Sequence, residues 1–274
     1  MNTVSDTFLM CKPSHFRVSY VINPWMDGNV DAAVQEESMR QWKELQSKIM
    51  SVAKVAEVKP GRKVPDMVFT ANAAVVRGKK AVISRFKHPE RQGEEALFCS
   101  YFLDNGFEVL YLPNGIPFEG AGDALFCRRH ADLLWMGYGH RTDEKATSYL
   151  RDYFGVAVVS LKLVDDRFYH LDTCFCPLEG GYLMYYPQAF DELSLAKIWA
   201  MYPVENRIEV SEEDALNFSC NAVNCGRNIF LNKASGGLKD QLEALGFSVH
   251  ETPLGEFMKA GGSAKCLTLR LNEE

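Results

Sequence analysis

A divergent repeat of about fifty residues runs through this chain and limits the folds that it can adopt. Each copy places small or polar residues ahead of a short apolar run. The residue just before that run marks the copy, and the five marks are Thr70, Glu119, His170, Asn217 and Ala264. Such a period is typical of repeat folds in which each module buries its apolar face against its neighbours.

The apolar runs come in pairs separated by turn residues, which predicts β-hairpins. The paired runs are 70–76 with 80–84, 119–126 with 133–137, 170–177 with 182–186, and 217–223 with 228–232. Helices are predicted between the hairpins, over 34–56, 93–105, 142–154, 191–201 and 237–245. A ββαβ module therefore recurs along the chain, which predicts an α/β fold of five pseudo-repeated units.

The two ends of the chain are expected to close these modules into a ring. The N-terminal run 16–21 precedes the first full copy, and the last copy ends soon after its strand, at Arg270. We therefore predict that the two ends complete one module together, which would leave no exposed strand edge. In such a ring the starts of the innermost strands surround one axis, so the polar residues at those starts face one another.

Length and composition favour one catalytic domain over residues 1–274. The chain has 47% apolar residues and no Pro/Gly/Ser-rich linker, so it can bury one substantial core. No apolar run is long enough for a membrane span, and the N-terminus is a poor secretory signal, so we expect a cytoplasmic protein without a membrane partner. The net charge of −6 disfavours nucleic acid as a partner and suits a cationic substrate. The sequence leaves the oligomeric state open, with a homo-oligomer among the options.

The eight cysteines are scattered without Cys-x-x-Cys spacing, which argues against a structural zinc site and against a disulfide framework. Cys174 and Cys176 lie close to His170 in the sequence, but their spacing is wrong for a tetrahedral metal pair. Strand alternation sends both thiols to one face of an apolar run, so we predict that they pack in the core. We predict neither a metal nor a cofactor.

Polar residues at the strand starts include one set with the chemistry of a reaction centre. The strand starts carry Asp66 and Asn72, Glu119 and Asp123, His170 and Asp172, Cys220 and Asn221, and Cys266. Cys266 offers a thiol nucleophile beside small residues that allow close approach, and His170 offers an acid–base group. The carboxylates of Glu119, Asp123 and Asp172 are suited to hold a cation or to orient the imidazole.

Four motifs resemble the guanidine-modifying superfamily of five-bladed α/β propellers, also called penteins. They lie at 69–72, 118–123, 169–173 and 261–266, in order along the whole chain. The superfamily includes arginine deiminases, amidinotransferases and dimethylarginine dimethylaminohydrolases. Segments 20–26, 65–72, 91–95 and 259–262 are most similar to the arginine dihydrolase group, which is found elsewhere as the front domain of larger ornithine-forming enzymes. We do not expect the second domain of those enzymes in this chain.

The resemblance implies a role for each reactive residue. Cys266 would be the nucleophile, His170 the general acid and base, and Glu119 the carboxylate that positions His170 or the substrate. The thiol would attack the guanidinium carbon, and water activated by His170 would then hydrolyse a covalent thiouronium. A charged His170 or the bound cation would promote formation of the thiolate.

The resemblance also implies contacts with a small guanidino substrate, either arginine or a methylated arginine. Asp172 would grip the guanidinium. Arg91 and Arg141 match positions that bind the substrate α-carboxylate in relatives, a task that suits the planar fork of a guanidinium. The remaining residues of the expected substrate-binding set are Asn23, Phe69 and Asp123.

Asn72 marks a departure from the deiminase pattern. Deiminases have Phe-Thr-Arg-Asp where this chain has Phe-Thr-Ala-Asn at 69–72. An aspartate offers only acceptors, whereas the Asn72 amide can also donate to the oxygen of a neutral ureido group. Citrulline would then be held for a second attack by Cys266. We therefore expect an arginine dihydrolase, which forms ornithine, ammonia and carbon dioxide.

Several alternatives remain open from the sequence. A dimethylarginine dimethylaminohydrolase or an arginine deiminase would use the same thiol and imidazole and release citrulline, and an amidinotransferase shares the covalent intermediate. A ring-shaped protein that binds arginine without catalysis is a candidate from another class. A metal-dependent hydrolase is a further candidate, which full activity in a chelator and an inactive Cys266→Ser variant would exclude.

Overall fold

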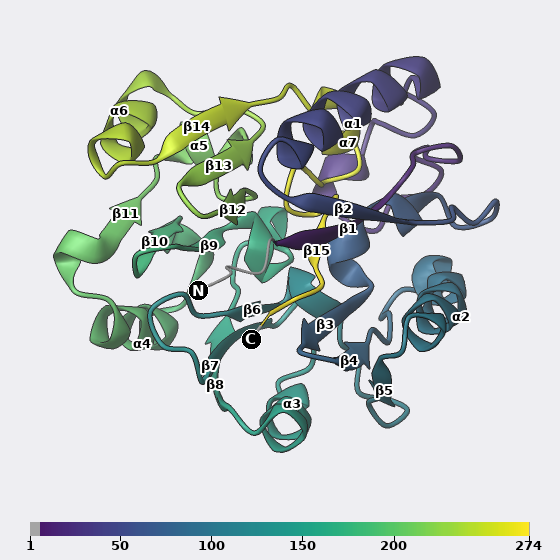
Figure 1. Ribbon diagram of the computed structural model, residues 1–274, viewed down its shortest axis with the longest axis horizontal. Helices are drawn as coiled ribbons and strands as arrows, with labels where there is room; N and C mark the ends of the chain where they lie inside the picture. The colour runs from purple at the N-terminus through teal and green to yellow at the C-terminus, as the bar shows by residue number, and fades with distance from the viewer. Residues whose placement is uncertain (1–5, 274) are drawn as a thin grey trace.

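Five small sheets surround one axis in the computed structural model, which describes residues 6–273 (Figure 1). In every sheet a central strand pairs antiparallel with one neighbour and in parallel with the other. The parallel partner follows a helix, so each blade is the ββαβ module that the repeat predicts. The prediction of a five-bladed α/β propeller is confirmed.

Four blades are continuous in sequence. The first contains β3 (Ala74–Arg77), β4 (Lys80–Ile83), α2 (Pro89–Asp104) and β5 (Glu108–Tyr111), and the second contains β6 (Ala124–Phe126), β7 (Leu133–Tyr138), α3 (Ala146–Phe154) and β8 (Ala157–Lys162). The third contains β9 (Phe175–Leu178), β10 (Tyr182–Tyr185), α4 (Glu192–Met201) and β11 (Arg207–Glu209). The fourth contains β12 (Val223–Cys225), β13 (Asn228–Leu231), α6 (Gly236–Ala244) and β14 (Ser248–Glu251), and the short helices α5 (Glu212–Leu216) and α7 (Gly255–Met258) lie in connecting segments.

The fifth blade joins the two ends of the chain, as predicted, but its N-terminal strand is not the expected one. It contains β15 (Leu269–Arg270), β1 (Thr7–Cys11), α1 (Gln35–Met50) and β2 (Lys54–Val58). Residues 16–21, which we expected to form the strand, lie outside every strand. Phe16 and Val18 are buried there, and the Phe16 ring lies 5.0 Å from that of Phe257. The apolar alternation in this segment therefore reflects a packed loop.

Three predicted helix boundaries also differ from the structure. The helix expected over 142–154 begins four residues later, at Ala146. The helix expected over 34–56 ends at Met50, because the chain turns at 51–53 and then forms β2 in parallel with β1. The helix expected from 93 begins earlier, at Pro89, a residue whose fixed φ suits the first turn of a helix. No helix within residues 6–273 is long and apolar enough to cross a bilayer.

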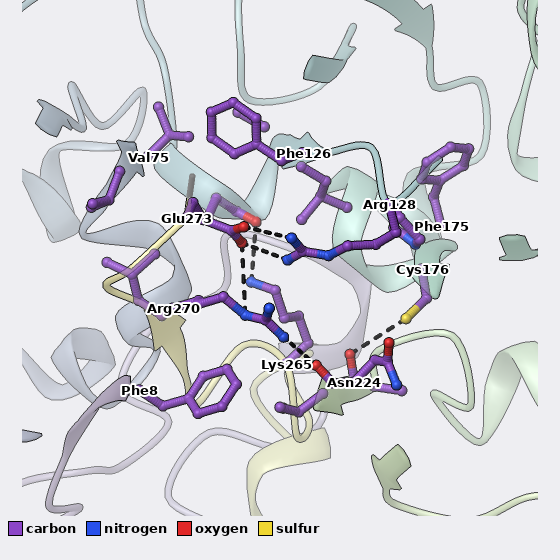
Figure 2. A pocket seen from close by; sticks show the side chains of 18 residues that line it. Phe8, Val75, Phe126, Arg128, Phe175, Cys176, Asn224, Lys265, Arg270 and Glu273 are labelled. Atoms are coloured by element: carbon purple, nitrogen blue, oxygen red, sulfur yellow. Dashed lines mark hydrogen bonds and ion pairs between the residues drawn. The ribbon is translucent and has the colours of Figure 1, made fainter. Parts of the chain in front are cut away.

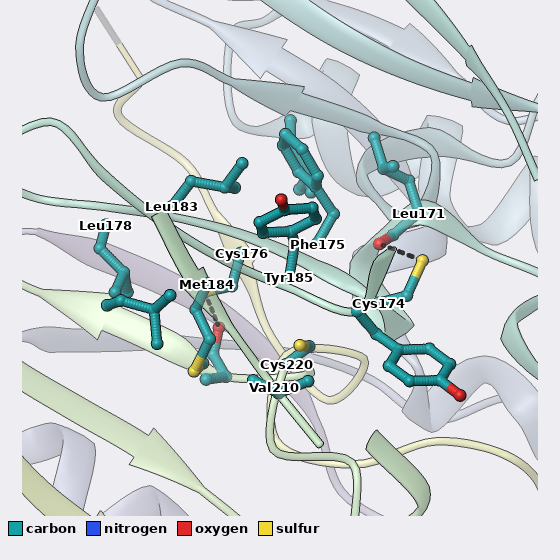
Figure 3. Close-up of a cluster of buried hydrophobic side chains, with 14 of the residues drawn as sticks. Leu171, Cys174, Phe175, Cys176, Leu178, Leu183, Met184, Tyr185, Val210 and Cys220 are labelled. Carbon is teal, nitrogen blue, oxygen red and sulfur yellow. Dashed lines mark hydrogen bonds between the residues drawn. The ribbon is translucent and has the colours of Figure 1, made fainter. Parts of the chain in front are cut away.

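The core is divided among the interfaces between blades. One large cluster joins the blades of β6–β8, β9–β11 and β12–β14, and Figure 3 shows Phe175, Leu183 and Tyr185 packed within it. Cys174 and Cys176 belong to the same cluster, which confirms the prediction that they pack in the core. Because each blade packs on its neighbours in this way, the strands nearest the axis are fixed relative to one another.

The inner strands β3, β6, β9, β12 and β15 lie nearest the axis (Figure 1). Short 3₁₀ turns, Thr70–Asn72, Gly120–Gly122 and Leu171–Thr173, immediately precede the first three of these strands. These turns pack on one another and hold the polar strand-start residues at one end of the axis.

Candidate active site

A small cavity lies at the end of the axis where the inner strands begin. Its wall is formed by Ile22, Asn23, Met26, Asp66, Phe69, Asn72, Arg91, Arg141, Tyr169, His170, Ala260, Gly262 and Cys266. Cys266 and His170 come from different blades and line this one cavity. Of the other residues predicted from the sequence, Asn72, Arg91, Arg141, Asn23 and Phe69 also line it.

His170 is held by a buried carboxylate. Its Nε2 lies 2.7 Å from Glu119 Oε2, and Arg141 Nη1 donates to the same oxygen at 3.1 Å. Burial alone would raise the pKa of Glu119, but Arg141 and His170 outweigh burial and hold that pKa well below its ordinary value. An ionised carboxylate only accepts, so Nε2–H of His170 donates to it. Burial lowers the pKa of His170 to about 4, so the ring is neutral near pH 7 and its Nδ1 is left as a proton acceptor.

Cys266 is fixed by Asn221, a strand-start residue for which we predicted no role. The Cys266 backbone N–H donates to Asn221 Oδ1 at 3.1 Å, and Asn221 Nδ2 lies 3.1 Å from the thiol sulfur. The Asp172 carboxylate lies 3.7 Å from the same sulfur. Burial, reinforced by Asp172, raises the pKa of the Cys266 thiol, so the thiol is protonated while the cavity is empty.

The loop that carries Cys266 requires glycine. Gly261 has φ +80°, and its carbonyl accepts a 2.7 Å hydrogen bond from the Tyr169 hydroxyl. A Cβ atom at Gly261 would lie 2.7 Å from that hydroxyl oxygen and 2.9 Å from Asn23 Oδ1. Asn23 in turn donates to the carbonyl of Ala260 at 3.1 Å, so it lines the cavity and also holds this loop.

Arg91 holds the amide of Asn72 in one orientation. Arg91 forms a bidentate ion pair with Glu94, with both hydrogen bonds 2.8 Å long, and donates from Nη1 to Asn72 Oδ1 at 2.9 Å. A guanidinium cannot accept a hydrogen bond, so the amide oxygen must face Arg91 and the NH₂ group must face away. Asn72 Nδ2 donates one hydrogen to the carbonyl of Glu119 at 3.2 Å and has a second hydrogen to offer.

The two arginines predicted to bind the substrate carboxylate differ in their remaining donors. Arg91 donates to Glu94, to Asn72 and to the carbonyl of Asp66, which uses most of its fork. Arg141 donates to Glu119 and to the carbonyl of Ile22, and its guanidinium carbon lies 4.6 Å from the centroid of the Tyr169 ring. Arg141 therefore keeps more donors for a ligand than Arg91 does.

Asp123 does not line the cavity, contrary to its place in the predicted substrate-binding set. Its Oδ2 accepts from the Thr142 hydroxyl at 2.7 Å, and its Oδ1 accepts from the backbone N–H of Leu171 at 3.0 Å. These bonds tie neighbouring blades together at the base of the site. Asp172 also lies outside the cavity wall, beside the Cys266 sulfur. Burial raises the pKa of Asp172 to about 7.

Asp66 lines the cavity, although it was not among the residues predicted to bind a ligand. The Tyr20 hydroxyl donates to its Oδ2 at 2.9 Å. Its Oδ1 is buried and has no hydrogen-bond partner among residues 6–273, which leaves an acceptor for a cationic ligand group. The signal was present in the sequence, because Asp66 belongs to the strand-start residues.

Known proteins share this fold and much of this sequence. A protein from Synechocystis named bifunctional arginine dihydrolase/ornithine cyclodeaminase ArgZ is 56% identical over 265 residues, covering 97% of this chain and 37% of the relative. The crystal structure of its N-terminal domain, a cysteine-to-serine variant described as bound to substrate, has a TM-score of 0.97 and 54% identity and covers 98% of both chains. A dimethylarginine dimethylaminohydrolase from Mycobacterium tuberculosis is 37% identical, covering 97% of this chain and 85% of that protein.

The chain spans little more than a third of the length of the bifunctional relatives that it matches, of which the one from Nostoc, AgrE, is 52% identical. The expected resemblance to the guanidine-modifying superfamily, nearest the arginine dihydrolase group, is confirmed by these matches. A family model described as "N,N dimethylarginine dimethylhydrolase, eukaryotic" matches residues 22–272. The chain therefore belongs to the N,N-dimethylarginine dimethylhydrolase family.

Proposed function

We propose that this chain is an arginine dihydrolase, which converts L-arginine and two waters into ornithine, two ammonia and carbon dioxide. The observation that carries the proposal is the shared cavity of Cys266 and His170, with His170 held by Glu119 at 2.7 Å. The Synechocystis relative adds support, because structures of its N-terminal domain are described as bound to product and as covalently bound to a reaction intermediate.

The first half of the reaction uses the thiol and the imidazole in turn. A bound guanidinium cation favours transfer of the Cys266 thiol proton to Nδ1 of His170. The thiolate then attacks the guanidinium carbon, and His170 passes that proton to the ammonia that leaves. The neutral His170 ring then takes a proton from water, which attacks the thiouronium carbon. The carbon–sulfur bond breaks, and citrulline and the free thiol result.

The second half repeats the attack on citrulline. The neutral ureido oxygen needs a donor, and the free hydrogen of Asn72 Nδ2 is the group that we assign to it. Ammonia leaves as before, and hydrolysis of the resulting thiocarbamate releases ornithine and carbon dioxide. Arg91 acts here as a positioning residue, because it prevents the Asn72 amide from turning.

The polar ends of arginine find complementary groups in the same cavity. We assign the substrate α-carboxylate to Arg141, which keeps free donors, and the α-ammonium to the unpartnered Oδ1 of Asp66. Asp172 would face the guanidinium only when that group lies against the Cys266 sulfur. Phe69 and Asn23 would bound the aliphatic part of the substrate.

The remaining proposals concern the chain as a whole. We infer one catalytic domain over residues 1–274 that needs no metal or cofactor, because the thiol and the imidazole supply the nucleophile and the proton transfers. Eight free cysteines in a chain of this kind suit a reducing compartment, so we place the protein in the cytoplasm. A homo-oligomer stays a prediction.

Product analysis tests the assignment. The protein is incubated with L-arginine and, separately, with asymmetric dimethylarginine, and citrulline, ornithine, ammonia and dimethylamine are followed over time. We expect ornithine and two ammonia per arginine, with little dimethylamine. Citrulline as the end product from arginine would favour an arginine deiminase, and faster turnover of dimethylarginine would favour the dimethylargininase activity for which the family is named. Binding of arginine without any product would leave only a binding protein.

A further inference from the structure

A second cavity lies on the same axis, at the other end of the inner strands. All five inner strands contribute to its wall. Residues in the turns at the strand starts line the candidate active site, and residues of the strands themselves line this second cavity. The inner strands therefore run from the candidate active site toward the second cavity. We call it the rear cavity, and none of the catalytic residues assigned above, Cys266, His170 and Glu119, lines it.

Three cations and one carboxylate lie in the wall of the rear cavity. Arg128 donates to both carboxylate oxygens of Glu273, at 2.6 and 2.7 Å, and Arg270 Nε lies 3.9 Å from the same carboxylate. Figure 2 shows the Arg128 and Arg270 side chains converging on Glu273. Burial alone would raise the pKa of Glu273, but the two arginines lower it below its ordinary value, so the group is an anion.

The third cation, Lys265, has no carboxylate within 4.0 Å among the described residues. Within residues 6–273 its ammonium donates to the carbonyl of Ala121, at 3.4 Å, and to no other acceptor. The two arginines have outer partners as well, since Arg270 lies 3.3 Å from Asp6 and Arg128 lies 3.9 Å from Glu179. Inside the wall, however, Glu273 is the one carboxylate that faces three cations.

The rest of the wall is apolar and aromatic. Phe8, Phe126 and Phe175 line it together with Val75, and Figure 2 shows these side chains on the sides of the cavity around the charged groups. A pocket with a few convergent charges in an apolar wall is the usual form of a small-molecule site. The bidentate contact of Arg128 with Glu273 has the geometry with which arginine recognises carboxylates in ligands.

We propose that the rear cavity binds a small carboxylate with an aromatic or apolar body, in the place that the Glu273 carboxylate occupies. Glu273 is an internal competitor, since it presents the same anionic group to Arg128 from the C-terminal segment. Its backbone carbonyl accepts from Gly78 at 2.7 Å, so the segment can stay attached while the side chain turns away. Lys265 then gains the anionic partner that it lacks.

The rear cavity adjoins the candidate active site through the chain itself. Lys265 lines the rear cavity and the next residue, Cys266, lines the front one. The proposal is nevertheless independent of the proposed function, because it rests on charges and walls that the reaction does not use.

Calorimetric titration with benzoate tests the proposal, and benzamide, its neutral analogue of the same shape, serves as the matched ligand. We expect saturable binding of benzoate and none of benzamide. Glu273→Gln removes the competitor and should tighten benzoate binding about tenfold, whereas Arg128→Gln removes the bidentate donor and should weaken it about tenfold. Arg151→Gln, an exposed arginine on α3, should leave the affinity unchanged.

The two variants of the rear cavity move the affinity in opposite directions, so failure of Arg128→Gln to fold would leave Glu273→Gln as the decisive one. Equal affinity for benzamide, or a benzoate affinity that Glu273→Gln does not raise, would overturn the proposal. Displacement of benzoate by L-arginine, measured in the Cys266→Ser variant, would place the probe in the front cavity and would also overturn it. These results do not depend on turnover, so they are distinct from a failure of the proposed function.

Discussion

The two cavities of the propeller axis are built from different parts of the same modules. The front cavity, which is the candidate active site, takes its polar groups from the turns before the inner strands. There a hydrogen bond from its backbone N–H to Asn221 fixes Cys266, and the carboxylate of Glu119 holds His170. The rear cavity takes its wall from the strands themselves, so its cysteine, Cys176, packs against the carbonyl of Ala222. Position within the module, and not residue type, decides which cysteine can react.

The largest expected effect distinguishes these two cysteines. Cys266→Ser should lower kcat for arginine by at least about 10⁴-fold, because a hydroxyl is a far weaker nucleophile at a guanidinium carbon. Cys176→Ser, the matched change in the rear cavity, should keep activity near that of the unchanged protein. The measurement is ammonia release at saturating arginine. Equal loss of activity in both variants would mean that the front cavity and the rear cavity are not functionally distinct.

The next effect concerns the imidazole. His170→Ala should lower kcat by about 10²- to 10⁴-fold, the range expected when a general acid–base is removed. His250→Ala is the control, because that ring stacks on Phe230 in the fourth blade, away from either cavity wall. A His170→Ala enzyme with ordinary turnover would show that another group transfers the proton.

Asn72→Asp should change the product rather than the first step. An aspartate cannot donate to the ureido oxygen, so citrulline should accumulate and the ornithine fraction should fall about tenfold. Chromatography of the products at several times measures both species. Asn224→Asp, in the wall of the rear cavity, should leave the product ratio unchanged. An ornithine yield that is the same in the Asn72 variant would remove the assigned role of the amide.

The smallest expected effect is a shift in the titration of Cys266. Burial, and then Asp172, raises the pKa of this thiol, so its thiolate forms only at high pH in the empty protein. A bound cation opposes both causes and should lower the midpoint by about one pH unit. Ultraviolet absorbance of the thiolate, corrected with Cys266→Ser, follows the titration with and without Nε-trimethyl-L-lysine, an unreactive cation that keeps its charge at high pH. Burial also raises the pKa of Cys176, to about 12, and this rear-cavity thiol should not respond.

Much of the fold could be predicted because the repeat is a local pattern. Each module must bury its hairpin against the next one, so the spacing of the strand starts alone indicated five blades and one axis. β1 was missed because Thr7–Cys11 becomes a strand only through its pairing with β15 and β2, which are distant in the sequence. The apolar alternation of 16–21 was the stronger local signal, and in the structure it serves loop packing.

The sequence predicted which residues form the site better than it predicted the contacts between them. That Cys266 and His170 share a cavity followed from their equivalent places in two modules. The hydrogen bond from Arg91 to Asn72 and the hydrogen bond from the Cys266 backbone N–H to Asn221 depend on rotamers that only the packed blades determine. The contacts of Asp123 were not predictable from its position, because a strand-start carboxylate can equally well tie two blades together.

A covalent adduct on Cys266 is the most direct test of the account as a whole. The protein is mixed rapidly with L-arginine, quenched in acid, digested and measured by mass spectrometry. The account predicts a peptide containing Cys266 whose mass is increased by that of arginine less one ammonia. During turnover, an adduct on another cysteine, or no adduct at all, would contradict it.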